Sequence, residues 1–139
     1  MTLIDTGPLV ALIDKADPTH QRCAAIFQLF SAAPVTTWPC LTEAFYLIGR
    51  LCGWHGQQRL LALLARMAVR IQAPNEDGIS RIGELMEQYK DTPMDFADAS
   101  LVVLSEITGM KHIFTLDDDF YFYKINGRDT FDVLKPDSA

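Results

Sequence analysis

The sequence predicts an α/β domain with a mainly parallel central sheet of four to five strands flanked by helices. Short apolar segments rich in β-branched residues alternate along the chain with longer segments that repeat apolar residues at helical spacing. Strands that alternate with helices form parallel sheets covered on both faces. The length of 139 residues suits one compact domain, and no repeat, low-complexity tract or Gly/Ser linker divides it. We therefore expect a single domain over residues 1–139.

Five segments are predicted to be strands, because each is a short run of apolar and β-branched residues. In chain order they are residues 2–5, 34–38, 69–73, 111–116 and 131–136, the last at an edge of the sheet. In open parallel sheets, ligands bind beyond the carboxyl ends of the strands. The residues that end these strands are therefore the first candidates for a functional site.

Six segments are predicted to be helices. In chain order they are residues 7–14, 19–33, 40–53, 56–68, 75–90 and 92–109. Gly53 and Gly109 are placed to end their helices. Thr92 and Asp95 have the spacing of a capping box, with Pro93 at the first helical position. This box predicts a firm start for the last helix.

The composition excludes several classes of protein. The formal net charge of −6 argues against an ordinary basic nucleic-acid-binding module, although a local acidic cluster would distort this total. Three cysteines without CxxC spacing predict neither a disulfide framework nor a structural zinc site. The apolar N-terminal segment has no basic leader and contains an aspartate, so we expect no signal peptide, no membrane partner and a cytoplasmic location.

Two aspartates follow predicted strands. Asp5 ends the first strand and Asp117 follows the strand over residues 111–116, so both are placed at the carboxyl edge of the sheet. Asp5 alone would be typical of a helix N-cap. Asp117 begins a run of three aspartates, which raise one another's pKa unless a cation neutralises them. The alternative is a solvated turn: Asp118 is expected in solvent, and Asp119 is either a supporting acid or a turn residue.

Three further acids lie in predicted helices. Glu43 is followed at helical spacing by Tyr46 and Leu47, so we expect it on a partly buried side. Asp95 is assigned to the capping box, whereas Asp98 lies one turn deeper among apolar residues, where an unpaired charge would be costly. Asp98 is therefore the predicted metal ligand, and Asp95 is a candidate supporting acid.

Other familiar motifs are absent from the sequence. It contains no Gly-rich phosphate loop, no dinucleotide-binding fingerprint, no serine nucleophile elbow and no calcium loop. The three histidines have no metal-binding spacing, and Trp38 and Trp54 are expected in the core or at an interface. The acidic residues are therefore the remaining candidates for catalysis.

The remaining candidates form a carboxylate set: Asp5, Glu43, Asp98 and Asp117. Oxygen ligands select hard cations, so the predicted cofactor is Mg²⁺ or Mn²⁺, with Asp5 and Asp98 as ligands. Without these four acids the formal charge changes from −6 to −2, and a bound dication makes it about neutral. An anionic substrate is therefore compatible with the acidic composition. Basic residues that could contact phosphate are Arg50, Arg59, Lys90, Lys124 and Arg128.

Four segments resemble the PIN domain, and in particular the VapC-type toxins of bacterial toxin–antitoxin pairs. They are "LIDTGPLVALID", "TEAFYLIGRL", "DFADASLVVLSE" and "IFTLDDDF", which occur in this order over nearly the whole chain. The resemblance implies a PIN-like fold and a metal-dependent endoribonuclease. In the implied reaction, water activated by the ion attacks an RNA phosphodiester without a covalent enzyme intermediate.

The resemblance also implies roles for individual residues and partners. It matches the catalytic acids of the family to Asp5, Glu43, Asp98 and Asp117. It places Thr115 at the family's Ser/Thr before the last acid and Asp119 at a common acidic position, so both are expected to support the site. It further implies an RNA substrate, a homodimer and inhibition by a cognate antitoxin protein.

Two other functions remain open at this point. A PIN-like nuclease could act in RNA processing outside toxin–antitoxin systems, and a PIN-fold module could bind without turnover. No acid of the set is missing, which disfavours the non-catalytic module. A phosphate-accepting receiver domain is also α/β and acidic, but the segments over 34–38 and 69–73 lack the strand-end aspartate and lysine that it needs.

Overall fold

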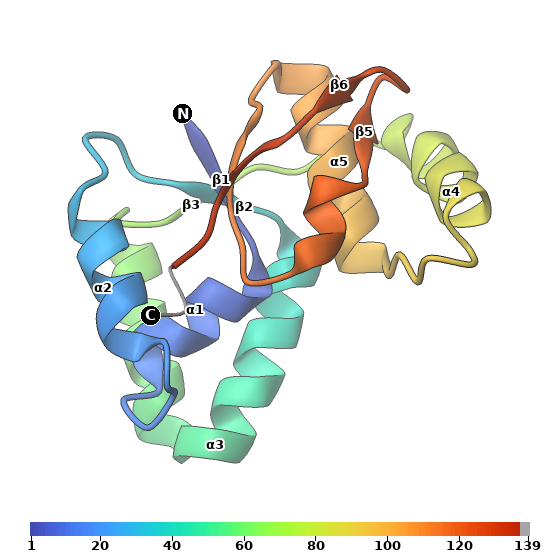
Figure 1. Ribbon diagram of the computed structural model, residues 1–139. Coiled ribbons are helices and arrows are strands. Elements are labelled where there is room, and N and C mark those ends of the chain that lie inside the picture. The colour runs from blue at the N-terminus through green and yellow to red at the C-terminus, as the bar shows by residue number, and fades with distance from the viewer. Residues whose placement is uncertain (137–139) are drawn as a thin grey trace.

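The computed structural model describes residues 1–136, which contain a five-stranded sheet (Figure 1). In spatial order its strands are β3 (Arg70–Ile71), β2 (Val35–Thr36), β1 (Thr2–Ile4), β4 (His112–Phe114) and β7 (Asp132–Leu134). All neighbouring pairs are parallel, and Leu3 in the central strand pairs with both Val35 and Ile113. The predicted fold class is confirmed, including the edge position of the last strand.

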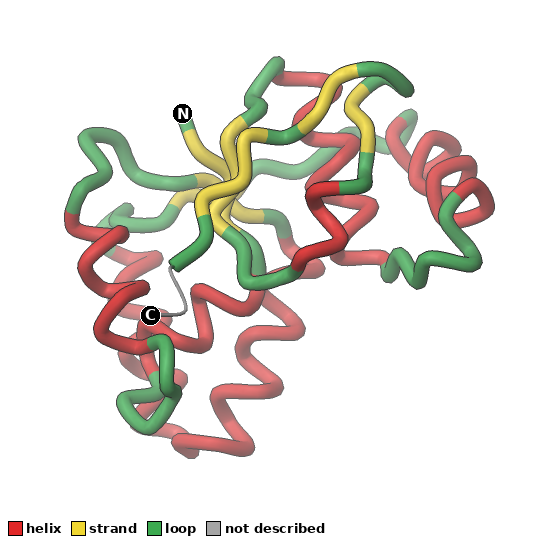
Figure 2. The backbone as a smooth tube through the Cα atoms, viewed as in Figure 1, coloured by secondary structure: helices red, strands yellow, loops and turns green. Residues whose placement is uncertain are grey.

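The α-helices within residues 1–136 lie on both faces of this sheet. They are α1 (Thr6–Ile13), α2 (His20–Gln28), α3 (Trp38–Ala65), α4 (Gly78–Gln88) and α5 (Phe96–Thr108). The first three pack on one face and the last two on the other, so the strands form the middle layer (Figure 2). Along the described chain, none of these helices is both long and apolar enough to cross a membrane.

The strands of the sheet send alternate side chains into the two helical layers. In β1, Leu3 packs with the α4 and α5 layer, whereas Ile4 packs with α1, α2 and α3. In β4, Ile113 and Phe114 divide in the same way. All four side chains are fully buried. The sheet is therefore held by apolar layers on both faces, as a parallel sheet requires.

Helix α3 consists of two helical parts that meet at a kink, as the two helices predicted from the sequence do at Gly53. It begins at Trp38, so the strand before it ends two residues earlier than predicted. At Gly53 the backbone leaves the helical conformation, with φ 67° and ψ −161°, and the helix kinks there. Glycine alone adopts this conformation without strain. The predicted helix end at Gly53 is confirmed, and both parts of α3 flank the same face of the sheet.

Helix α5 begins one turn later than the predicted capping box at Thr92. Asp95 is the N-cap: its carboxylate accepts a hydrogen bond from the Asp98 amide at 2.8 Å. The Asp98 carboxylate accepts from the Asp95 amide at 3.3 Å, which completes the box. The predicted box was wrong because the spacing from Thr92 to Asp95 is the same as that from Asp95 to Asp98. At the other end, Gly109 has φ 80° and ends the helix as predicted.

Three short elements between β4 and β7 were not predicted. A 3-10 helix (Asp118–Tyr121) follows β4, and β5 (Lys124–Ile125) forms an antiparallel hairpin with β6 (Asp129–Thr130). Phe120 and Tyr123 from this region are fully buried in the α4 and α5 layer. The segment therefore closes that layer next to the end of β4.

Candidate metal centre

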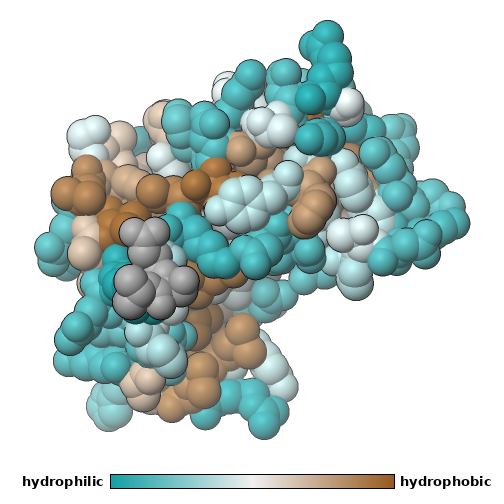
Figure 3. Space-filling view, in the orientation of Figure 1, coloured by the Kyte–Doolittle hydropathy of each residue, from teal (hydrophilic) through white to brown (hydrophobic). Residues whose placement is uncertain are grey.

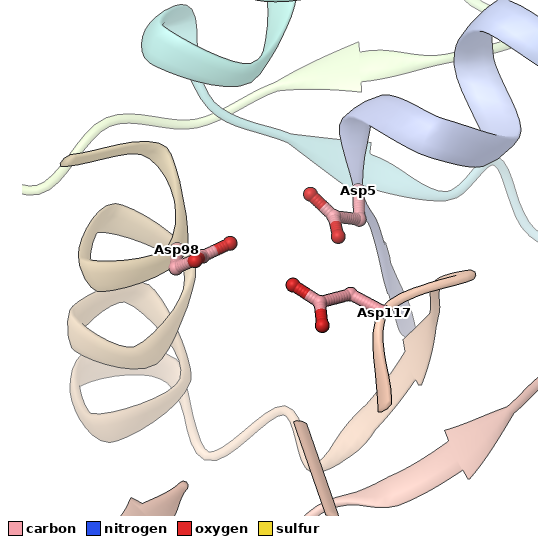
Figure 4. Close-up of side chains that lie close together, drawn as sticks. All are labelled: Asp5, Asp98 and Asp117. Atoms are coloured by element: carbon pink, nitrogen blue, oxygen red, sulfur yellow. The ribbon is translucent and has the colours of Figure 1, made fainter. Parts of the chain in front are cut away.

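Three aspartates meet at the carboxyl edge of the sheet (Figure 4). Asp5 follows β1 and Asp117 comes shortly after the neighbouring strand β4, while Asp98 reaches the same point from α5. One carboxylate oxygen from each residue lies within 4.8 Å of the others. The fold therefore brings together three of the four acids that the sequence singled out.

Asp5 receives a hydrogen bond on each carboxylate oxygen. Its Oδ1 accepts from the Thr6 amide at 2.7 Å, which makes Asp5 the N-cap of α1. Its Oδ2 accepts from the Thr115 hydroxyl at 2.7 Å. Burial raises the pKa of Asp5 from 3.8 to about 6, opposed by these two hydrogen bonds and assisted by the charges of Asp117 and Glu43. One side chain thus serves both as a helix cap and as a member of the acidic cluster.

Asp98 is buried, with only 7% of its surface exposed. Its Oδ2 accepts from the Asp95 amide at 3.3 Å, and the Tyr123 hydroxyl donates to the same oxygen at 3.4 Å. Burial first, and then the charges of Asp5 and Asp95, raise the pKa of Asp98 to about 8. The expectation that Asp98 has no capping role was wrong, because it completes the capping box of α5. Both contacts use Oδ2, which leaves Oδ1 for a ligand.

Thr115 connects two of the three acids. Its hydroxyl donates to Asp5 Oδ2 at 2.7 Å and accepts from the Asp117 amide at 2.9 Å. The side chain is fully buried just after β4. Asp117 Oδ1 in turn accepts from the Asp119 amide at 2.9 Å, so Asp117 is the N-cap of the 3-10 helix. This chain of hydrogen bonds fixes the positions of Asp5 and Asp117 relative to each other.

The chemistry of the cluster fits a hard divalent cation. All three groups offer carboxylate oxygens, which are the ligands that Mg²⁺ and Mn²⁺ prefer. Within residues 1–136, no Lys, Arg or His forms an ion pair with any of the three. Their repulsion contributes to the raised pKa values of Asp5 and Asp98, and a bound dication would relieve it.

The other predicted acids lie around this cluster. Glu43 is exposed on α3, so the expected partly buried position was wrong, although its charge still raises the pKa of Asp5. Asp119 is half-buried and its amide donates to Asp117; burial first, and then the charge of Asp117, raise the pKa of its carboxylate. Asp118 is exposed as expected, and it pairs with Lys135. Neither Glu43 nor Asp119 is among the carboxylates that meet.

Sequence reasoning missed two side chains that border the cluster. Tyr123 is fully buried with its hydroxyl against Asp98, and Cys40 Sγ lies 4.0 Å from Asp5 Oδ1. Burial raises the pKa of the Cys40 thiol to about 12, so it forms a neutral wall of the site. The signal for Tyr123 was weak, because it is the last of four consecutive aromatic residues, of which the middle two are exposed.

The parallel sheet and the acidic cluster at its carboxyl edge define the class of this chain as an α/β domain built around a carboxylate site. The sequence pattern of the PIN domain matches residues 2–126, and the chain belongs to the PIN domain family. The match runs from β1 to β5 and contains all four predicted catalytic acids. The family resemblance seen in the sequence is thereby confirmed.

The chain is similar to a ribonuclease in sequence, and to a toxin and a toxin–antitoxin complex in fold. It is 28% identical over 115 residues to ribonuclease VapC26 of Mycobacterium tuberculosis, covering 83% of this chain and 85% of that protein. Its fold matches the crystal structure of Mycobacterium tuberculosis VapC20, a sarcin–ricin loop cleaving toxin, with a TM-score of 0.79. That match has 19% identity and covers 86% of this chain and 92% of the other. A toxin–antitoxin complex from Klebsiella pneumoniae matches with a TM-score of 0.70 and 17% identity over 100% of both chains.

Proposed function

We propose that this chain is a Mg²⁺- or Mn²⁺-dependent endoribonuclease and the toxin of a type II toxin–antitoxin pair. The observation that carries this proposal is the meeting of three carboxylates at the sheet edge. One relative is named a ribonuclease, one structural relative is a toxin that cleaves the sarcin–ricin loop, and another is a toxin–antitoxin complex. These relatives support an RNA phosphodiester as the substrate and an antitoxin as the partner.

Asp5, Asp98 and Asp117 are the proposed ligands of the ion. When bound, the ion supplies a Lewis acid that draws charge from the scissile phosphate and activates water for attack. The protein supplies fixed ligand positions. The Thr115 hydroxyl holds Asp5, and the Asp95 amide holds Asp98, so little reorganisation is needed when substrate binds.

Glu43 is the proposed fourth catalytic acid. It lies on α3, exposed, and close enough to Asp5 for its charge to raise that pKa. A carboxylate on an exposed, flexible side chain can accept a proton from the attacking water or approach the ion once RNA is bound. Asp95 and Asp119 are proposed to support the site through the backbone contacts that hold Asp98 and Asp117.

The proposed partners include a second copy of this chain and a cognate antitoxin in the cytoplasm. Helix α3 exposes three leucines that pack only partly against the rest of the chain, namely Leu47, Leu51 and Leu61. In Figure 3, hydrophobic atoms gather in the lower part of this face, where α1 and α3 lie in Figure 1. Exposed apolar surface of this kind is typical of proteins that associate.

The deciding experiment is cleavage of total RNA by the purified protein with Mg²⁺ or Mn²⁺. We expect cleavage by the wild type, loss of cleavage on chelation by EDTA, and at least about a hundredfold loss in Asp98→Asn, which removes one ligand charge. Asp91→Asn, which changes an exposed aspartate outside the cluster, is the matched control and should cleave like the wild type. Equal cleavage by wild type and Asp98→Asn would sink the proposed site.

A growth assay distinguishes a toxin from a nuclease that acts in RNA processing. Induction of a toxin arrests growth, and co-expression of its antitoxin restores it. Cleavage of RNA in vitro without growth arrest would favour RNA processing. Binding of RNA without any metal-dependent cleavage would favour the non-catalytic module.

A further inference from the structure

A groove of about 670 Å³ opens between the start of α3 and the start of α5. Trp38 and Tyr46 line it from α3, and Phe96 lines it from α5. These three rings are 59%, 61% and 46% exposed, so the core position considered for Trp38 is wrong. Flat aromatic faces that remain open to solvent are the surfaces on which nucleobases stack.

The groove lies beside the acidic cluster, although none of the three aspartates lines it: its lining residue Asp95 exchanges hydrogen bonds with Asp98. Pro39 and Ala97 also line it, and the buried Cys40 follows Pro39 in the chain. The Cys40 thiol contacts the Ala97 carbonyl oxygen at 3.9 Å and Asp5 Oδ1 at 4.0 Å. A phosphodiester held at the cluster would therefore have the nucleoside next to it beside this groove.

The charge of the groove favours a base over a phosphate. Its charged lining residues are Glu43 and Asp95, and no lysine or arginine among the described residues lines it. Two carboxylates repel a phosphate, but they accept hydrogen bonds from the amino groups of a base edge. Arg50 lies beyond Tyr46, whose hydroxyl accepts a hydrogen bond from Arg50 Nη1 at 3.1 Å. Arg50 is placed to meet a phosphate outside the groove.

We propose that this groove binds an unpaired nucleobase of the RNA substrate, next to the scissile phosphate. Trp38 and Phe96 stack on the base, and the Asp95 carboxylate accepts hydrogen bonds from its N–H groups, while Glu43 keeps its proposed catalytic role. Guanine, which presents two adjacent N–H donors, suits such a carboxylate better than uracil, whose single N–H lies between two carbonyl groups. This proposal rests on the proposed ribonuclease function and assigns its base selectivity.

The test measures RNA binding apart from cleavage. The Asp98→Asn variant, which is expected to be inactive, is titrated against a short fluorescein-labelled single-stranded RNA, and anisotropy gives the dissociation constant. Adding Trp38→Ala or Phe96→Ala should weaken binding about tenfold or more, the usual cost of losing a stacking partner. Trp38→Phe should restore most of the affinity, because it keeps an aromatic face.

Trp54→Ala is the matched control for Trp38→Ala. Trp54 lies on the same helix beyond the kink, outside the groove, and is 58% exposed, against 59% for Trp38. The double variant Asp98→Asn/Trp54→Ala should bind RNA with the same affinity as Asp98→Asn alone. Thermal unfolding of all variants checks that they fold.

An abasic scan of the RNA ties the groove to a single base. Removing one base should weaken binding to Asp98→Asn about tenfold and leave binding to Asp98→Asn/Trp38→Ala unchanged, because the stacking partner is already gone. Equal sensitivity of both proteins at every position would overturn the proposal. Normal RNA binding by the Trp38 and Phe96 variants, with loss only of inhibition by an antitoxin, would also overturn it and assign the groove to a protein.

The two proposals fail in different ways. If the wild type shows no metal-dependent RNA cleavage but the abasic scan still couples to Trp38, the proposed function fails and the base-binding groove stands. If the wild type cleaves RNA but the Trp38 and Phe96 variants match Trp54→Ala, the groove proposal fails and the ribonuclease stands.

Discussion

Thr115 offers one hydroxyl group to two acids, donating to Asp5 and accepting from the amide of Asp117. Valine has nearly the same shape as threonine but can make neither hydrogen bond. The backbone amide of Asp117 and one oxygen of Asp5 would then be left without a partner in a buried place. Replacing Thr115 by valine is therefore expected to affect both stability and cleavage, although it hardly changes the volume of the side chain.

We predict that Thr115→Val lowers the rate of RNA cleavage by about 10- to 100-fold, as losses of groups that orient metal ligands do. It should also lower the free energy of unfolding by about 1–3 kcal/mol, because buried polar groups lose their partner. Cleavage rates over a Mg²⁺ titration and chemical denaturation measure the two effects. Thr115→Ser keeps the hydroxyl and should recover most of the activity; a dead serine variant would contradict this role.

The sequence was sufficient to find Asp5, Asp98 and Asp117 for physical reasons. Two of them end or follow apolar strands, and the third is a charge among apolar residues, which is costly without a function. The exposure of Glu43 and the burial of Tyr123 could not be predicted from the sequence. Both depend on which side of an element packs against the sheet, and for Tyr123 the preceding aromatic residues gave no distinction.

At the scale of elements, the kink of α3 depends on Gly53, whose φ of 67° and ψ of −161° strain any other residue. We predict that Gly53→Ala lowers the free energy of unfolding by about 1–3 kcal/mol. Space is not the obstacle, since a Cβ at Gly53 would have no atom within 4 Å. Denaturation with urea measures the change.

Gly83 provides the matched control for Gly53. It lies exposed within α4 and also has free space for a Cβ, but its φ is not positive. Gly83→Ala should therefore raise the free energy of unfolding by about 0.5–1 kcal/mol, because alanine favours a helix. If both substitutions lowered the free energy of unfolding, the positive φ at Gly53 would not explain the effect of Gly53→Ala.

The order of strands and helices was predictable, whereas their exact limits and the shortest elements were not. Each long helix carries several turns of apolar spacing, and each sheet strand is an apolar run. The β5 and β6 strands have two residues each, too few to show any alternation. The start of α5 could not be decided from the sequence, because two capping boxes of equal spacing overlap at Asp95.

At the scale of the whole molecule, the acidic cluster makes stability depend on pH. In the folded protein the pKa of Asp5 is raised to about 6 and that of Asp98 to about 8, from 3.8. Their protons are thus held more tightly in the folded state. Proton binding to Asp5 and Asp98 therefore adds to the free energy of unfolding. This contribution is fully present below about pH 4, and it is lost as the pH rises through the pKa of Asp5 at about 6 and that of Asp98 at about 8.

We predict that the metal-free protein in EDTA has a lower unfolding temperature at pH 8 than at pH 6. Saturating Mg²⁺ should raise the unfolding temperature most at the higher pH, because the ion binds the deprotonated cluster of the folded state. Calorimetry across this range measures both. Asp98→Asn, which removes the group with the larger shift, should show a flatter dependence; the same steep dependence in Asp98→Asn would contradict the assignment.

The hydrogen bond between Thr115 and Asp5 joins residues 110 positions apart in the chain. Closing so long a loop costs conformational entropy that no local structure repays, so this contact forms only when β1 and β4 pair. We therefore expect no acidic cluster before β1 and β4 have paired. During refolding, the ability to bind a divalent ion should return with the slow, cooperative formation of the sheet and not with the early helices.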